Sequence, residues 1–255
     1  MARTSIVIMT AGGANPAIVI NALAKCWPDL NVVVEQAESK SAIWKRRARR
    51  LGPVAATGQL ATMVAGRLLK SSAARRAAEI IAEYGVSTEL TSSVPVHHFA
   101  SLNDPACRDF VRTLEPGVVL TVSSRLLTRA TLADMPCPVI NLHAGINPAY
   151  RGQMGAYWSL IENDATNFGA TVHLVDAGTD TGGTLYEVRA TPSPRDFIST
   201  YPLLLTAAST GIVIRAVEDA LAGTLQPRAA EGRSVLRFPP TIWRWVWNGI
   251  ARGIW

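Results

Sequence analysis

Short runs rich in valine and isoleucine recur along this chain, and segments with helical periodicity separate them. The clearest runs cover residues 5–10, 31–35, 117–122 and 136–143. Runs that are apolar throughout are typical of parallel strands covered on both faces, and parallel strands need a long crossover that is usually helical. The pattern predicts an α/β fold with an open, doubly wound, mostly parallel sheet. Further extended segments are expected at residues 94–99, 170–175 and 185–189.

The first run leads into a glycine turn and then a helix. Gly12 and Gly13 follow the run, and Asn15 and Pro16 open an apolar stretch that continues to about Cys26. Asn15 is expected to cap this helix, because its side chain can accept a hydrogen bond from a free backbone N–H. The turn lacks the GxGxxG spacing of dinucleotide sites. Gly12, Gly13 and Asn15 are instead candidates for holding a substrate phosphate on the free backbone N–H groups at the start of the helix, with a purely structural turn as the alternative.

The helical segments divide the chain into a main domain over residues 1–193 and a helical C-terminal extension over residues 194–255. Helices are expected at residues 39–84, 104–114, 153–162 and 194–221. Gly52-Pro53 should break the first of these segments, and Pro202 should interrupt the last, because proline lacks the backbone N–H that a helix interior uses.

Several classes of protein are excluded by composition. No run of about 18 apolar residues occurs, which argues against a membrane-spanning helix. The N-terminal apolar run ends in Gly12-Gly13 rather than in a signal-cleavage pattern, so the protein is expected to be cytoplasmic. Cys26, Cys107 and Cys137 are widely spaced, so we expect reduced core thiols and neither a disulfide framework nor a zinc site.

The net charge of +6 favours anionic partners. Much of the excess lies in residues 45–50 and 67–76, which form either solvated helix faces or a patch for a phosphate or an anionic membrane. Apart from Trp44, aromatic residues do not interleave with this charge, as they commonly do in proteins that bind nucleic acid. We therefore expect no nucleic-acid partner.

Two polar residues interrupt the strand predicted at residues 136–143. Asn141 and His143 are two apart, so their side chains should share one face at the carboxyl end of the strand, where open α/β sheets bind ligands. An amide and an imidazole can donate hydrogen bonds to an oxyanion. Asp180 follows on a glycine-bounded loop that could bring its carboxylate to His143 and relay a proton through water. The structural alternative is a satisfied polar pair and an ordinary turn.

The surroundings of these residues resemble a known signature. Residues 141–152 (NLHAGINPAYRG), followed by GATVH at 169–173 and DTG at 180–182, closely resemble the folate-dependent formyltransferases, a family that includes glycinamide ribonucleotide, methionyl-tRNA and nucleotide-sugar N-formyltransferases. The resemblance is strong over residues 90–190 and loose over residues 1–35. It implies a Rossmann-like formyltransferase fold and places catalysis in the main domain.

The resemblance also implies roles for individual residues. Asn141 and His143 match the oxyanion-binding pair, and Asp180 matches the aspartate that orients the histidine and handles protons. The co-substrate would be N10-formyltetrahydrofolate, with no metal. The implied folate contacts are Ser124, Arg125, Leu127, Val139 and Asp176. His173 is interpreted as a core or orienting histidine, with a second base or metal ligand as the alternative.

The acceptor implied by the resemblance is an anionic amine. Tyr150 and Arg151 are expected at the mouth of the site, because a planar guanidinium suits an anionic substrate. The C-terminal extension looks similar to formyltransferases of surface-polysaccharide pathways such as lipopolysaccharide biosynthesis, which act on nucleoside-diphosphate amino sugars. Alternatives are a glycinamide ribonucleotide-type formyltransferase, a formyltetrahydrofolate hydrolase and a non-enzymatic folate- or nucleotide-binding regulatory protein.

The chain ends in a tail rich in tryptophan and arginine. Its aromatic and basic residues are Trp243, Arg244, Trp245, Trp247, Arg252 and Trp255. Such residues suit the inner face of a membrane, where the tail would make a peripheral contact. The alternative is a helix that docks onto its own domain or onto the second copy of a homodimer.

Overall fold

The computed structural model describes residues 5–91 and 93–255, so residues 1–4 of the predicted main domain lie outside it. A seven-stranded sheet runs through the described part in the order β3-β2-β1-β4-β5-β7-β8. Its strands are β1 (Ile6–Thr10), β2 (Leu30–Glu35), β3 (Val96–Phe99), β4 (Val118–Val122), β5 (Val139–His143), β7 (Gly169–Leu174) and β8 (Thr184–Arg189). The first five are parallel to one another, and β7 is antiparallel to both of its neighbours, β5 and β8, which confirms the predicted mostly parallel sheet.

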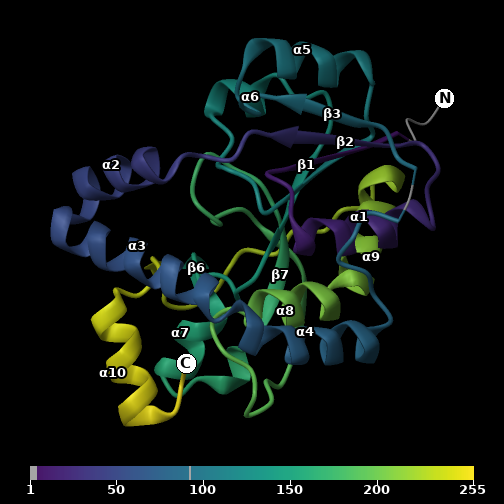
Figure 1. The fold of residues 1–255 in the computed structure, drawn as a ribbon. Coiled ribbons are helices and arrows are strands. Elements are labelled where there is room, and N and C mark those ends of the chain that lie inside the picture. The colour runs from purple at the N-terminus through teal and green to yellow at the C-terminus, as the bar shows by residue number, and fades with distance from the viewer. Residues whose placement is uncertain (1–4, 92) are drawn as a thin grey trace.

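Alternate residues of the central strands β1, β2, β4 and β5 face two different cores, which is why the predicted runs are apolar throughout. In β1, Ile6 and Ile8 face a core that includes helices α1 (Ala14–Ala24), α7 (Gly155–Ile161), α8 (Tyr201–Ala208) and α9 (Thr210–Ala222). Val7 and Met9 face a second core with α5 (Pro105–Thr113) and α6 (Arg129–Ala133) (Figure 1). A short 3-10 helix at Ala165–Asn167 precedes β7.

Three local expectations need correction. Asn15 is not the cap of α1, because the helix begins at Ala14 and its N-cap is Gly13, which makes no side-chain cap hydrogen bond. Pro202 lies in the first turn of α8, where a missing N–H is harmless, and the break between α8 and α9 falls at Ser209. Cys26 is exposed, whereas Cys107 is buried as expected of a core thiol.

In the described part of the chain, three helices separate β2 from β3: α2 (Lys40–Leu51), α3 (Pro53–Leu68) and α4 (Lys70–Tyr84). The predicted break occurs at Gly52, whose φ of 86° starts the turn into α3. A second break, at Leu69, has no glycine or proline to announce it. In Figure 1, α2 and α3 project to one side of the sheet, while α4 lies beside α8.

The tail forms helix α10 (Ile242–Arg252), which packs against α3 of the same chain. Trp245 is buried, and the ring of Trp243 occupies the space beside Gly58. Other helices of the predicted C-terminal extension belong to the core: α8 and α9 contribute Leu204 and Val213 to the cluster beneath the sheet. Among the described residues, no helix is both long and apolar enough to cross a membrane.

Candidate active site

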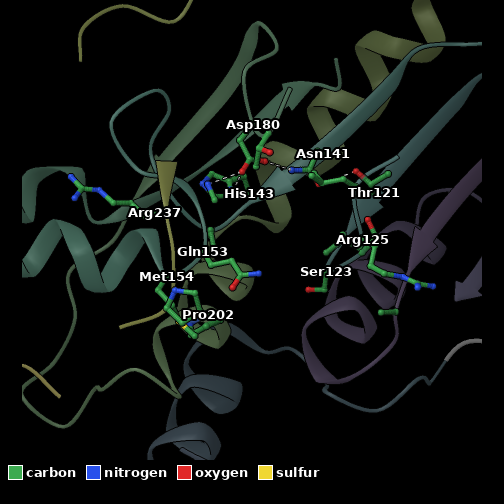
Figure 2. Close-up of a pocket in the computed structure, with 18 of the residues that line it drawn as sticks. Thr121, Ser123, Arg125, Asn141, His143, Gln153, Met154, Asp180, Pro202 and Arg237 are labelled. Carbon is green, nitrogen blue, oxygen red and sulfur yellow. Dashed lines mark hydrogen bonds and ion pairs between the residues drawn. The ribbon is translucent and has the colours of Figure 1, made fainter. Parts of the chain in front are cut away.

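A cavity of about 710 Å³ opens at the carboxyl ends of β1, β4 and β5. It lies at the point where the strand order reverses, between β1 and β4, which is where doubly wound sheets bind ligands. Asn141, His143 and Asp180 line this cavity together. Figure 2 shows the three side chains pointing toward one another, as the positions of Asn141 and His143 on one strand predicted.

Asn141 holds a defined orientation at the end of β5. Its Oδ1 accepts a hydrogen bond from the hydroxyl of Thr121 at 2.8 Å, and its Nδ2 lies 3.4 Å from Oδ1 of Asp180. A carboxylate only accepts hydrogen bonds, so the amide nitrogen must be the atom that faces Asp180. The amide nitrogen therefore lies on the side of Asn141 that faces Asp180 and the cavity lining.

His143 has a tautomer fixed by its surroundings. Its Nε2 lies 2.8 Å from the backbone carbonyl of Tyr150, which can only accept, so Nε2 carries a hydrogen. Nδ1 then faces Oδ2 of Asp180 at 3.6 Å and is the nitrogen available for proton exchange. This close packing requires Gly145, because a Cβ there would lie 2.6 Å from Nε2 and 2.5 Å from the Tyr150 carbonyl oxygen.

Asp180 joins the other groups of the site. Its Oδ2 accepts a hydrogen bond from the backbone N–H of Gly152 at 2.8 Å, and its Oδ1 lies 3.4 Å from Nε2 of His173. Burial favours the neutral carboxyl, but His143, His173 and the Gly152 N–H outweigh it and lower the pKa of Asp180 to about 2. Asp180 is therefore a fixed negative charge at neutral pH.

Three residues other than glycine in the described part of the chain line the cavity with a left-handed backbone conformation. They are Ser123, Met154 and Asp180, with φ values of 50°, 62° and 51°. This conformation is costly for residues other than glycine and persists only where surrounding contacts impose it. In the case of Asp180, the bond to Gly152 and the hydrogen bond from Arg151 Nη1 to the carbonyl of Thr179 hold the loop in place.

His173 is buried against the site rather than separate from it. Its Nδ1 lies 2.6 Å from the carbonyl of Leu174 and therefore carries a hydrogen, while its Nε2 lies 3.0 Å from Nδ2 of Asn141 and 3.4 Å from Oδ1 of Asp180. The register explains this contact, because β7 places His173 directly opposite Asn141. The described residues contain no cluster of three or more side chains suited to a metal ion.

The residues predicted to contact folate fall into two groups. Ser124, Arg125 and Leu127 line the cavity, as does Asp176, whose carboxylate closes its own loop by accepting from Gly178 N–H at 2.9 Å. Arg125 Nε donates to Glu35 at 2.6 Å, so its charge is already matched. Val139 instead belongs to the core on the far side of the sheet.

Most of the residues predicted to contact the acceptor do not line the cavity. Asn15 lines the cavity, whereas Gly12 and Gly13 do not, and the N–H of Gly12 donates to Thr10 Oγ1 at 3.0 Å. The Tyr150 hydroxyl is turned away to Asp164 at 2.7 Å. Arg151 clamps the Asp180 loop through Thr179 and is not among the residues that line the cavity.

Several residues that line the cavity were not anticipated. Thr121, Gln153 and Met154 come from the ends of β4 and β6 (Arg151–Gly152), and Arg237 comes from β9 (Leu236–Arg237), which pairs with β6. The β6–β9 pairing joins residues that are more than 80 positions apart, so no local pattern announces it. Thr121 could have been found, since it is the polar residue in a valine-rich strand directly beside Asn141.

Sequence comparison identifies related proteins over part of their length. A methionyl-tRNA formyltransferase of Geobacter sulfurreducens is 36% identical over 102 residues, which make up 39% of this chain and 31% of that protein. One from Corynebacterium glutamicum is 28% identical over 170 residues, or 66% of this chain and 52% of that protein. The chain thus spans about half, or less, of the length of these curated relatives.

Solved structures share the fold at low identity. Glycinamide ribonucleotide transformylase 1 of Symbiobacterium toebii has a TM-score of 0.58 at 18% identity, covering 92% of this chain and 95% of that one. A sugar N-formyltransferase from a Shewanella species has a TM-score of 0.57 at 11% identity, covering 92% and 76%. These likenesses confirm the predicted Rossmann-like formyltransferase architecture.

A family model described as formyl transferase matches residues 4–201. The matched part contains the whole seven-stranded sheet and the three convergent side chains Asn141, His143 and Asp180. This chain therefore belongs to the formyl transferase family.

Proposed function

We propose that this protein is an N-formyltransferase that moves the formyl group of N10-formyltetrahydrofolate to the amino group of a nucleotide-linked amino sugar. The observation that carries the proposal is the convergence of Asn141, His143 and Asp180 on one point of the cavity wall. A structural polar pair would be closed off by its own contacts, whereas these groups face a cavity of about 710 Å³, a size typical of ligand sites.

The carbonyl chemistry falls to Asn141 and His143. When an amine nitrogen attacks the formyl carbon, a C–N bond forms and the carbonyl π electrons move to oxygen, which becomes an oxyanion. The Asn141 amide and the protonated His143 Nδ1 donate hydrogen bonds to that oxygen, and donors fixed before the reaction stabilise the charge most effectively. Thr121 and the Tyr150 carbonyl supply this fixation by holding the amide and the ring.

The proton balance falls to Asp180. The attacking nitrogen loses one proton and the folate nitrogen gains one as its bond to the formyl carbon breaks, so no net acid or base is consumed. Because the pKa of Asp180 is lowered to about 2, its carboxylate stays charged, orients the His143 ring and holds the water that passes the proton. This role follows from its position between both histidines.

The cavity wall fits a reduced folate on one side. Leu126 and Leu127 follow β4, and Leu126 is 61% exposed although it is apolar. An exposed leucine beside backbone donors and acceptors is suited to a flat heterocycle such as a pterin. We propose that Ser124, Arg125 and Leu127 form this side of the site.

Turnover with a panel of acceptors tests the function. Purified protein is incubated with N10-formyltetrahydrofolate and amino-sugar nucleotides, glycinamide ribonucleotide or no acceptor, and products are measured by mass spectrometry. We expect a gain of one formyl group on a sugar nucleotide. Formate release at the same rate without acceptor would favour a hydrolase, and formylation of glycinamide ribonucleotide alone would contradict the acceptor class.

We also propose that the exposed face of α10 contacts an anionic lipid surface. Its exposed apolar residues Val246, Trp247 and Ile250 lie on the side opposite the buried Trp245, next to Trp243, whose ring also packs beside Gly58 of α3. The net charge of +6 complements an anionic surface, whereas Arg244 and Arg252 of the same helix contact the Trp158 ring and the Ile161 carbonyl. The sugar-nucleotide substrate would then meet the enzyme near the inner face of the membrane.

Vesicle flotation tests this contact. The double substitution Trp247→Ala/Ile250→Ala removes the two most exposed side chains of the face, at 68% and 72%. We expect the bound fraction on phosphatidylserine vesicles to fall several-fold, whereas Leu90→Ala, an exposed apolar control elsewhere, should have no effect. Unchanged binding, or a dimer in light scattering that the double substitution dissociates, would assign the face to another partner.

A further inference from the structure

We propose that Arg47, Arg50 and Arg67 form a subsite for the phosphate groups of the acceptor, which rests on the proposed function and names how it recognises its substrate. These residues belong to the basic stretches at residues 45–50 and 67–76. The sequence alone did not decide whether those stretches are solvated helix faces or a patch that binds an anion. All three line the cavity that contains Asn141, His143 and Asp180.

Helical spacing explains why the guanidinium groups gather on this wall. Arg47 and Arg50 are three apart on α2, so their side chains share a helix face. Arg67 lies one turn after Met63 on α3, and Met63 Sδ is 3.4 Å from Nη1 of Arg47. The paired helices α2 and α3 thus present their cations to one side, toward the cavity.

The other arginines of the cavity already have carboxylate partners. Arg46 pairs with Glu38 at 2.6 Å, Arg125 with Glu35 at 2.6 Å and Arg237 with Glu162 at 2.6 Å. Their charges are matched within the protein. They are therefore poor candidates for an external anion.

Arg47, Arg50 and Arg67 have no such partner in the described part of the chain. Arg47 Nη2 donates to the neutral amide oxygen of Gln153 at 3.1 Å, and Arg50 lies 4.9 Å from the centre of the Phe238 ring. Neither contact neutralises charge. Three unmatched guanidinium groups on one wall form a site of high positive potential, and guanidinium binds phosphate oxygens in a bidentate way.

Arg47 carries an electrostatic cost in the free protein. Its side chain is half-buried, and burial, followed by repulsion from Arg46, lowers the pKa of Arg47 below its usual value, with Glu38 only partly opposing them. A buried cation without a counter-ion is unfavourable, so a bound anion would offset a cost that the free protein already carries.

The subsite is connected directly to the reacting groups. Gln153, the partner of Arg47, follows Gly152, whose N–H binds Asp180. A phosphate that replaces Gln153 on Arg47 would therefore lie beside the catalytic loop. This placement suits a substrate whose amine and phosphates belong to one molecule.

The cavity wall that follows β4 differs in character, which is why we assign the cations to the acceptor and not to the glutamate carboxylates of folate. That wall carries Leu126 and Leu127, and its arginine, Arg125, is neutralised by Glu35. The two walls thus separate an apolar ligand surface from a basic one.

Anion binding in the absence of turnover tests the proposal. Inorganic pyrophosphate and UDP are titrated by calorimetry into the wild type, the single Gln variants and the triple variant Arg47→Gln/Arg50→Gln/Arg67→Gln. Hydrogen bonds to charged groups predict a loss of about 10-fold in affinity for a single substitution and about 100-fold or more for the triple. Arg49→Gln, an exposed arginine of the same helix that does not line the cavity, should change affinity less than about 2-fold.

Each outcome has a distinct meaning. If wild type binds neither probe, or Arg49→Gln weakens binding as much as the single variants, the subsite is wrong. If the triple variant loses affinity for tetrahydrofolate instead, the cations belong to the folate tail. The variant Arg47→Lys/Arg50→Lys/Arg67→Lys keeps the three positive charges and should recover part of the affinity. That recovery would show that the Gln variant loses affinity through the missing charge and not through unfolding. Retained pyrophosphate binding without formyl transfer to any amine would overturn the proposed function alone.

Discussion

His143→Ala is expected to lower kcat/KM for formyl transfer by about 10³-fold, because it removes both an oxyanion donor and the group paired with Asp180. The imidazole is buried, and its Nδ1 faces the cavity because the Tyr150 carbonyl occupies Nε2. Binding of tetrahydrofolate should stay within about 3-fold, since the ring acts on the reacting carbonyl and not on the pterin wall. Stopped-flow turnover and calorimetry measure the two quantities separately.

A histidine outside the cavity provides the control for this variant. His98 lies exposed on β3, at the far edge of the sheet, so His98→Ala should leave kcat/KM unchanged. A rate for His143→Ala close to that of the wild type would remove the proposed mechanism. A loss of tetrahydrofolate binding equal to the loss of turnover would instead assign His143 to binding.

Asp180→Ala is expected to lower kcat/KM by about 10²- to 10³-fold, because the charge that orients the His143 ring and the acceptor for Gly152 N–H are both lost. Asp180→Asn separates these contributions. Its amide oxygen can still accept from Gly152, so the loop keeps its conformation while the charge disappears. We expect the Asn variant to be as well folded as the wild type yet to recover less than one tenth of the lost activity.

The same residue predicts a pH dependence of stability. The pKa of Asp180 is about 2 in the folded protein, below its value in the unfolded chain, so the folded state favours the charged form. Its contribution is complete above the unfolded value of about 4 and disappears as the pH falls through about 2. Relative to Asp180→Asn, the unfolding free energy of the wild type should fall by about 2 kcal/mol between pH 5 and pH 2. Urea titrations across this range measure it, and parallel curves would show that the carboxyl pKa is not lowered.

Local patterns were sufficient for the sheet because each central strand is covered on both faces. The runs at β1 and β4 are apolar in every position but one, since alternate residues face different cores. The same local logic placed Asn141 and His143 on one side of β5. The formyl transferase match over residues 4–201 confirms the family that the 141–152 motif indicated.

Local patterns failed where a partner distant in sequence decides the structure. Arg151 was expected at the mouth of the site, but the carbonyl of Thr179 holds its guanidinium, and its backbone pairs with Leu236. The Tyr150 side chain is directed to Asp164, and its carbonyl, which no side-chain pattern describes, fixes His143. Helix-capping rules favoured Asn15, yet the helix starts two residues earlier, with Gly13 as its N-cap.

The sequence by itself determined the strand and helix alternation, the family and the three residues proposed for catalysis, because period and motif are properties of neighbouring residues. Only the tertiary structure decided which arginines face the cavity, which nitrogen of His143 is free and how the tail packs. Arg47 and Arg49 are indistinguishable as letters in one basic run, and they differ only because α3 and Gln153 lie against one side of α2. Electrostatic and hydrogen-bond contacts depend on distances across the fold, and a linear pattern does not contain those distances.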